Sequence, residues 1–155
     1  MGKGEIKRLK TDRAYGIVIF KKFPRSLKIL VLKDSEKWGS FPKGHKDKRE
    51  NKLEAAKREL YEETGIKKIN LISKKILLSQ SYKFKRKNGE EYLKRNEFFF
   101  AEVNSDKVKI DKKEVSNYKW LTETKAVKIA QYVSFRKSIK EAFGIIKKYY
   151  KGNYK

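Results

Sequence analysis

The chain has 155 residues, enough for one domain with a substantial buried core, and its 42 lysines and arginines against 19 acids give a formal net charge of +23 at pH 7. It contains no cysteine, which excludes disulfide bonds and thiolate metal sites and is compatible with a reducing cytoplasm. Because no apolar run approaches the roughly 18 residues of a membrane span and the charged opening lacks the apolar centre of a secretory signal, we expect a cytoplasmic monomer that does not engage membranes.

The part of the chain before residue 44 predicts two strands followed by a loop. Residues 14–20, AYGIVIF, are rich in β-branched and aromatic side chains and predict a buried strand. A turn signal, FPRS, precedes residues 27–33, which predict a second strand. Residues 34–43 are expected to form a loop that leads to Lys43, a cation able to hold a phosphate oxygen. His45, the only histidine, fits either an exposed loop position or a phosphate-binding one.

Residues 44–66, GHKDKRENKLEAAKRELYEETGI, contain the pattern of an amphipathic helix. Leu53, Ala56 and Leu60 recur at helical spacing, which gives residues 53–64 one apolar face. A glycine follows at position 65, where the C-cap of such a helix is expected.

The acids of this helix are placed against its local preference. Glu59, Glu62 and Glu63 share a neighbouring face in the last turns, where the helix dipole disfavours anions and like charges repel. Such a conflict is typical of a functional site, and clustered carboxylate oxygens are what Mg²⁺ prefers. The alternative is a solvated acidic face on which Arg58 and Glu54 form ordinary surface ion pairs.

The second half of the chain predicts a hairpin. Residues 71–84 and 92–103 read as strands around Asn88-Gly89, a pair typical of a type I′ turn. Tyr82 on the first strand is expected either to stack on a nucleobase or to belong to the core. Several basic residues are expected to gather at this hairpin, as a patch that faces polyphosphate or RNA or as a solvated loop: Lys85, Arg86, Lys87, Lys94 and Arg95.

The C-terminal part predicts a short strand and one or two helices. Residues 111–120 read as a loop and a strand, and residues 126–150 carry apolar side chains at helical spacing. The tail, residues 147–155, has four lysines and no acid, and we expect it to be frayed or to lie on the surface.

The 44–66 stretch matches every fixed position of the pattern G-x5-E-x7-R-E-U-x-E-E-x-G-U, in which U is aliphatic, and so resembles a Nudix box. The resemblance implies a single Nudix hydrolase domain over residues 1–155, an α/β/α sandwich around a mixed central sheet. It also implies cleavage of a nucleoside diphosphate linked to another group, with Mg²⁺ as cofactor and Mn²⁺ as an alternative. By the same resemblance, metal would be held by Glu59, Glu62, Glu63 and the Gly44 carbonyl, while Glu50 and Arg58 would pair and brace the loop against the helix.

Shorter motifs outside the box resemble the asymmetric diadenosine tetraphosphate hydrolases. They are W-x-x-F-P-K-G-H before the acidic loop, K-x-x-x-F-F-F-A-E-V after the hairpin, and E-x-x-x-x-x-W-L near residue 120. The likeness implies that Lys43, His45 and Lys94 contact phosphate and that Tyr82 lies near a nucleobase. Glu114 would help with the metal or with the attacking water.

The expected reaction is the splitting of diadenosine tetraphosphate into ATP and AMP by in-line attack of water on a phosphorus, with Glu59 or Glu114 activating the water. The first alternative is an RNA 5′-end pyrophosphohydrolase or decapping enzyme, because the large positive charge would guide a long polyanion. The other explanation is a lysine-biased composition that spreads solvated charge over the surface, and the lack of a combined aromatic and basic RNA-binding motif slightly favours it. A catalytically silent Nudix module used for binding is a further alternative, although its box would be expected to be damaged. A diphosphoinositol phosphate is a further candidate substrate.

Overall fold

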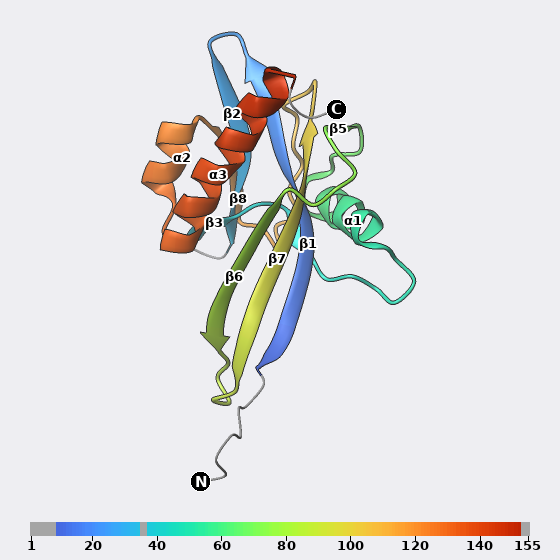
Figure 1. Cartoon of the computed structure of the whole chain (residues 1–155), viewed down its shortest axis with the longest axis vertical. Helices are drawn as coiled ribbons and strands as arrows, with labels where there is room; N and C mark the ends of the chain where they lie inside the picture. Colours follow the sequence, from blue (N-terminus) through green and yellow to red (C-terminus); the bar gives the residue numbers. More distant parts are fainter. Residues whose placement is uncertain (1–8, 35–36, 153–155) are drawn as a thin grey trace.

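One mixed sheet forms the centre of the molecule (Figure 1). The computed structural model describes residues 9–34 and 37–152, so residues 1–8 of the charged opening and residues 153–155 of the expected tail lie outside the described part. In chain order the elements are β1 (Lys10–Phe23), β2 (Ser26–Asp34), β3 (Lys37–Ser40), β4 (Lys43–Gly44), α1 (Lys52–Thr64), β5 (Asn70–Leu71), β6 (Leu78–Lys85), β7 (Glu91–Glu102), β8 (Asn117–Leu121), α2 (Glu123–Ile129) and α3 (Val133–Tyr150).

The sheet mixes parallel and antiparallel pairs. Strands β3, β2, β1, β7 and β5 lie side by side in that order, β6 also pairs with β7, β8 with β2, and β4 with β1. β1 and β7 run parallel, with Asp12 opposite Lys94 and Phe20 opposite Glu102. The other strand pairs are antiparallel. The prediction of a mixed central sheet is confirmed.

Helices cover both faces of this sheet, α1 on one side and α2 with α3 on the other (Figure 1). Alternate residues of β1 serve the two faces: Ile17 and Ile19 pack with Leu60 of α1, whereas Val18 and Phe20 pack with Phe143 of α3. A strand buried on both faces needs an unbroken apolar run, which explains why β1 does not alternate with polar residues. The predicted α/β/α sandwich is confirmed.

Two predictions about where strands begin and end are wrong. The expected loop 34–43 contains the short strands β3 and β4. This segment has too few β-forming residues for its sequence to predict them. The expected single strand 71–84 is divided into β5 and β6, because Ile72 N–H donates to Phe100 O and Leu77 N–H donates to Phe98 O, so that residues 73–76 loop out between them.

The hairpin between β6 and β7 turns one residue earlier than Asn88-Gly89 suggests. Gly89 N–H donates to Arg86 O, and Arg86 N–H donates to Glu90 O, at 2.9 Å each. Lys87 and Asn88 therefore occupy the centre of the turn, and Gly89 follows with a φ of 86°. This is the three-residue loop that ends in a left-handed glycine, in place of the expected type I′ turn.

The C-terminal region forms two helices, and the expected tail begins inside the second of them. Residues 147–150 complete α3, because Tyr149 and Tyr150 pack edge-on against Phe20, and the Tyr150 hydroxyl donates to the Glu102 carboxylate. Within the described residues, no helix is both long and apolar enough to cross a membrane.

Candidate active site

Helix α1 is fixed at both ends by its own sequence. The Asn51 side chain accepts from Glu54 N–H at 2.8 Å, and the Glu54 carboxylate accepts from Asn51 N–H at 2.9 Å, which is a complete capping box. At the other end Gly65 adopts the left-handed conformation, with a φ of 72°, and donates to Tyr61 O. Glu54 is therefore a helix cap and not the partner in a surface ion pair.

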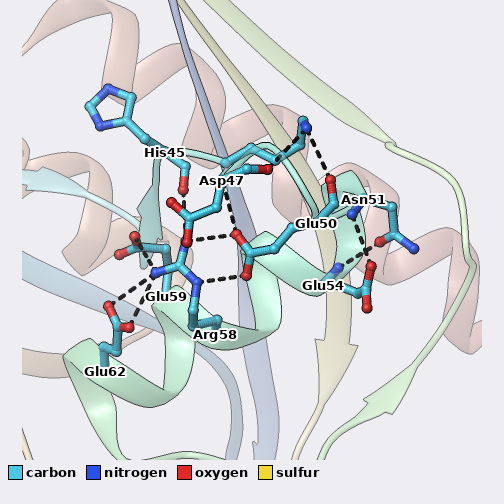
Figure 2. Close-up of polar contacts among 9 residues, drawn as sticks. His45, Asp47, Glu50, Asn51, Glu54, Arg58, Glu59 and Glu62 are labelled. Atoms are coloured by element: carbon cyan, nitrogen blue, oxygen red, sulfur yellow. Dashed lines mark hydrogen bonds and ion pairs between the residues drawn. The ribbon is translucent and has the colours of Figure 1, made fainter.

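Arg58 ties the loop before α1 to the acids of the helix (Figure 2). Its Nε and Nη2 donate to the two oxygens of Glu50 at 2.6 and 2.9 Å, and Nη2 also donates to the His45 carbonyl at 2.9 Å. On its other side, Nη1 donates to Glu59 at 3.0 Å and to Glu62 at 3.1 Å. A bidentate arginine–carboxylate pair holds its geometry well, so Arg58 fixes the loop against the acidic face of the helix.

Strand β4 brings the chain backbone against two of these acids. Lys43 N–H donates to Glu63 Oε1 at 2.8 Å. At Gly44 there is no room for a side chain, because a Cβ atom would lie 2.0 Å from Cδ of Glu59. The glycine of the box is thus required by the close approach of β4 to the carboxylate of α1.

Burial makes the acidic face a site that attracts cations. Burial raises the pKa of Glu63 to about 8, against the Lys43 N–H bond that lowers it, and repulsion from Glu59 and Glu114 raises it further. Burial also raises the pKa of Glu59, in part offset by Arg58. Both carboxyl groups are therefore poorly compensated as anions, and a cation placed between them would supply the missing charge.

The oxygen atoms gathered at this site are suitable ligands for a hard divalent cation such as Mg²⁺. Within residues 9–34 and 37–152, no three acidic or histidine side chains are already close enough to enclose a metal ion. Instead, the cationic Nη1 of Arg58 stands between Glu59 and Glu62, which marks the place where a metal would compete for their oxygens. The residues that could hold the ion are Glu59, Glu62 and Glu63, with hard oxygen ligands, and the adjoining Gly44 carbonyl.

Glu114 lies near this cluster without touching it. It is exposed, and it lies close enough to raise the pKa of both Glu59 and Glu63. Its loop is anchored to the end of α1, since Asp111 N–H donates to Glu63 O and Glu114 N–H donates to Asp111 O. The structure therefore brings all four predicted acids to one end of α1.

The Lys43 side chain belongs to a pocket of about 490 Å³ on the α3 side of the sheet. Tyr82 of β6 lines this pocket, together with Tyr132, which precedes α3. Burial lowers the pKa of the Lys43 ammonium, and the nearby Lys94 lowers it further. Tyr132 was missed from the sequence, because nothing in its local pattern distinguishes it from the other tyrosines of the chain.

His45 and Lys94 lie outside this pocket and share one partner, Asp12. His45 Nε2 lies 2.7 Å from Asp12 Oδ1, and Lys94 Nζ donates to Asp12 Oδ2 at 3.2 Å. Burial alone would raise the pKa of Asp12, but these two partners lower it below its usual value. The sequence did not indicate Asp12, because its partners lie 33 and 82 positions away.

Two members of the predicted basic patch, Lys94 and Arg95, do not share a surface. Lys94 shares a face with Asp12 and Tyr82, whereas Arg95 points to the opposite face, where it approaches Glu97 at 3.8 Å. Adjacent residues of a strand point to opposite sides, so these two cations cannot act together.

Comparison with known proteins agrees with this site. The family model described as NUDIX domain matches residues 10–143. Bis(5′-nucleosyl)-tetraphosphatase [asymmetrical] from Rattus norvegicus is 32% identical over 139 residues, covering 83% of this chain and 91% of the rat protein, and its Mus musculus counterpart matches to the same extent. The solved binary complex of C. elegans Ap4A hydrolase is 28% identical, with a TM-score of 0.72, and covers 87% of this chain and 97% of that one. The chain therefore belongs to the NUDIX family and is a Nudix pyrophosphohydrolase.

Proposed function

We propose that the chain hydrolyses diadenosine tetraphosphate to ATP and AMP with Mg²⁺ as cofactor. Lys43 is the observation that carries this proposal. Its side chain lines the pocket that holds Tyr82 and Tyr132, while its backbone N–H donates to Glu63 of the acidic cluster. A base-sized pocket and a metal-binding face are thus joined through one residue, as the cleavage of a nucleotide's phosphate chain requires. The names of the rat, mouse and C. elegans relatives support the same substrate.

In this proposal the chain positions the two ends of the substrate separately. The nucleobase lies between Tyr82 and Tyr132, whose rings offer apolar faces for stacking. Lys43, with His45 and Lys94 beside it, binds phosphate oxygens and fixes the phosphate chain toward α1. When bound to Glu59, Glu62 and Glu63, a divalent ion would neutralise the charge of the phosphates and of the transition state.

Glu114 is the better candidate for the group that takes a proton from the attacking water. Among the described residues its carboxylate has no hydrogen-bond or ion-pair partner, whereas Glu59 is already bonded to Arg58 and pressed against Gly44. A general base must reach the water with a free oxygen, and the contacts of Glu59 with Arg58 and Gly44 leave Glu114 the more available of the two. Water then adds to phosphorus as the bridging P–O bond breaks, and the departing phosphate oxygen leaves with the electron pair of that bond.

The test is product analysis by anion-exchange chromatography after incubation with diadenosine tetraphosphate and Mg²⁺. The expected products are equal amounts of ATP and AMP. Glu63→Gln should run in parallel, with turnover reduced about a hundredfold or more and with an unchanged circular dichroism spectrum. No turnover by the wild-type chain, or a near-normal rate of the variant at saturating Mg²⁺, would contradict the proposal.

A second candidate, the hydrolysis of RNA 5′ ends, is favoured by the shape and charge of the hairpin. The ends of β6, β7 and β1 extend beyond the helices (Figure 1), and Lys83, Lys85, Arg86 and Lys87 are exposed there. Binding of a short 5′-triphosphorylated RNA should then weaken steeply with salt, with a log–log slope of roughly −0.7 for each phosphate contacted. Binding that does not change with salt would exclude this candidate.

A further inference from the structure

A line of hydrogen-bonded amides, of which Asn96 is buried and Gln80 half-buried, runs from the sheet to α3 along the pocket of Lys43. Gln80 on β6 and Asn96 on β7 are paired in register, and the Asn96 Nδ2 atom donates to Gln80 Oε1 at 3.1 Å. Gln80 Nε2 donates in turn to Ser138 Oγ on α3 at 2.7 Å, and Ser138 Oγ donates to the Ser134 carbonyl at 3.1 Å. Both amides line the pocket.

The hydrogen bond from Ser138 to the Ser134 carbonyl, at the α3 end of this line, determines the orientation of both amides. A backbone carbonyl can only accept, so the Ser138 hydroxyl gives its single hydrogen to Ser134 and must accept from Gln80. Gln80 therefore turns its NH₂ toward Ser138 and its oxygen toward Asn96. The NH₂ of Asn96 donates to that oxygen. Reversing both amides would make Ser138 donate to Gln80 and would forfeit its bond to Ser134.

This polarity leaves one acceptor unused at the pocket. Asn96 is 1% exposed, and its Oδ1 atom has no hydrogen-bond partner among the described residues. A buried acceptor without a hydrogen-bond partner is unfavourable. A ligand that brings a donor to this acceptor therefore binds more tightly than a ligand that does not. Tyr82, which is 40% exposed, hydrogen-bonds to the Asn96 side chain, and a base that enters the pocket meets both residues because both line it.

We infer that Asn96 Oδ1 selects a purine with an amino group at C6 over one with a carbonyl there. Adenine presents the N–H of its 6-amino group to this oxygen. Hypoxanthine and guanine present a carbonyl at that position, which the oxygen repels, and their N1–H reaches the oxygen only if the base shifts within the pocket. The inference rests on the proposed function, because it assigns the pocket to the base of the nucleotide. It assigns the discrimination to Asn96, with Gln80 and Ser138 as positioning residues that hold its orientation.

The experiment is isothermal titration of the wild-type chain with ATP and with ITP in the presence of EDTA, where no turnover is needed. ATP and ITP carry identical phosphate chains and differ in the base, so the lysines contribute equally to both. We expect ATP to bind about tenfold more tightly or better. Ser138→Ala frees the amide pair to reverse and should bring the ratio of the two affinities close to one.

Ser134→Ala is the matched control, because Ser134 enters the line only through its backbone carbonyl, which alanine retains. Its ratio should equal that of the wild-type chain. Equal affinities for ATP and ITP in the wild-type chain, no binding of either, or a Ser138→Ala protein that keeps the full preference would overturn the inference. The hydrolysis assay with diadenosine tetraphosphate is read separately, so a failure of the proposed function is recognised by absent turnover even where ATP is preferred.

Discussion

His45 Nε2 and Asp12 Oδ1 lie 2.7 Å apart, although Asp12 is at the beginning of β1 and His45 follows β4. The other oxygen of Asp12 accepts from Lys94, so that one carboxylate contacts both side chains. Asp12 itself is half-buried, with 19% of its side chain exposed. It therefore restricts where the side chains of His45 and Lys94 can point.

Asp12→Asn should weaken substrate binding, because His45 and Lys94 lose the partner that orients them. We expect KM for diadenosine tetraphosphate to rise roughly three- to tenfold with little change in kcat. If charge alone mattered, removing a negative charge beside the phosphates would lower KM. The control is Asp106→Asn, which removes the same charge from an exposed loop position, and steady-state kinetics with a thermal unfolding check would distinguish these outcomes.

Gly44→Ala should damage the acidic cluster, because the new methyl group would overlap the Glu59 carboxylate. We expect a loss in kcat of about a hundredfold or more, since the metal ligands can no longer adopt their arrangement. Gly144→Ala is the matched control: among the described residues no atom lies within 4 Å of a Cβ placed there in the middle of α3. It should keep full activity and raise the free energy of unfolding by about 0.5–1 kcal/mol. A Gly44→Ala protein with normal kcat would show that Glu59 can move without cost.

Because of the Glu50–Arg58 pair, we expect the folded chain to become less stable as the pH falls. The hydrogen bond from Arg58 lowers the pKa of Glu50 to about 2, from an ordinary value of 4.5. Because the folded value is the lower one, the stabilisation is complete above pH 4.5 and is lost as the pH falls toward 2. Glu50→Gln should therefore flatten the melting temperature between these pH values relative to the wild-type chain.

Glu141→Gln, at an exposed position of α3, is the comparison for this acid effect. Its melting curves should follow those of the wild-type chain through the same pH range. Equal acid sensitivity of Glu50→Gln and the wild-type chain would show that the loop of the box is not held by this pair.

Tyr150→Phe should destabilise the end of α3, because it removes the hydroxyl that donates to Glu102. The ring stays in contact with Phe20, so the expected loss is about 1 kcal/mol in the free energy of unfolding, measured by urea denaturation. The neighbouring Tyr149→Phe keeps an equivalent ring, and its hydroxyl makes no hydrogen bond to the described residues. No loss in Tyr150→Phe would place the stabilisation in the ring contacts, and an equal loss in both variants would show that the bond to Glu102 adds nothing specific.

The parts of the site that could be predicted from the sequence are those whose residues lie close together along the chain. Glu59, Glu62 and Glu63 are brought together by one helix, and Gly65 ends that helix, so the sequence of α1 alone specifies them. Arg58 reaches Glu50 over only eight positions. Each of these distances is fixed by helix geometry and one short loop.

The parts that could not be predicted depend on how distant strands pair. Asp12 meets Lys94 because β1 and β7 run parallel in one particular register, and a strand's register is set by the whole sheet. Asn96 acquires its orientation from Ser138, 42 positions further along the chain, through Gln80. The two-residue strand β4 has too few residues to show any period.

The parallel pairing of β1 with β7 also affects the order in which the chain can fold. β1 and β2 adjoin in sequence and can form their hairpin as soon as residue 34 is available. The other edge of β1 waits for β7, some 80 residues later, and closing so long a loop is slow. Until β7 has been synthesised, Ile17 to Phe20 belong to an open strand edge at what becomes the centre of the sheet, and that edge is available to other chains. We therefore expect refolding yield to fall with protein concentration, and substitutions that strengthen the β1–β2 hairpin to leave this sensitivity in place, because they do not cover the edge that β7 occupies.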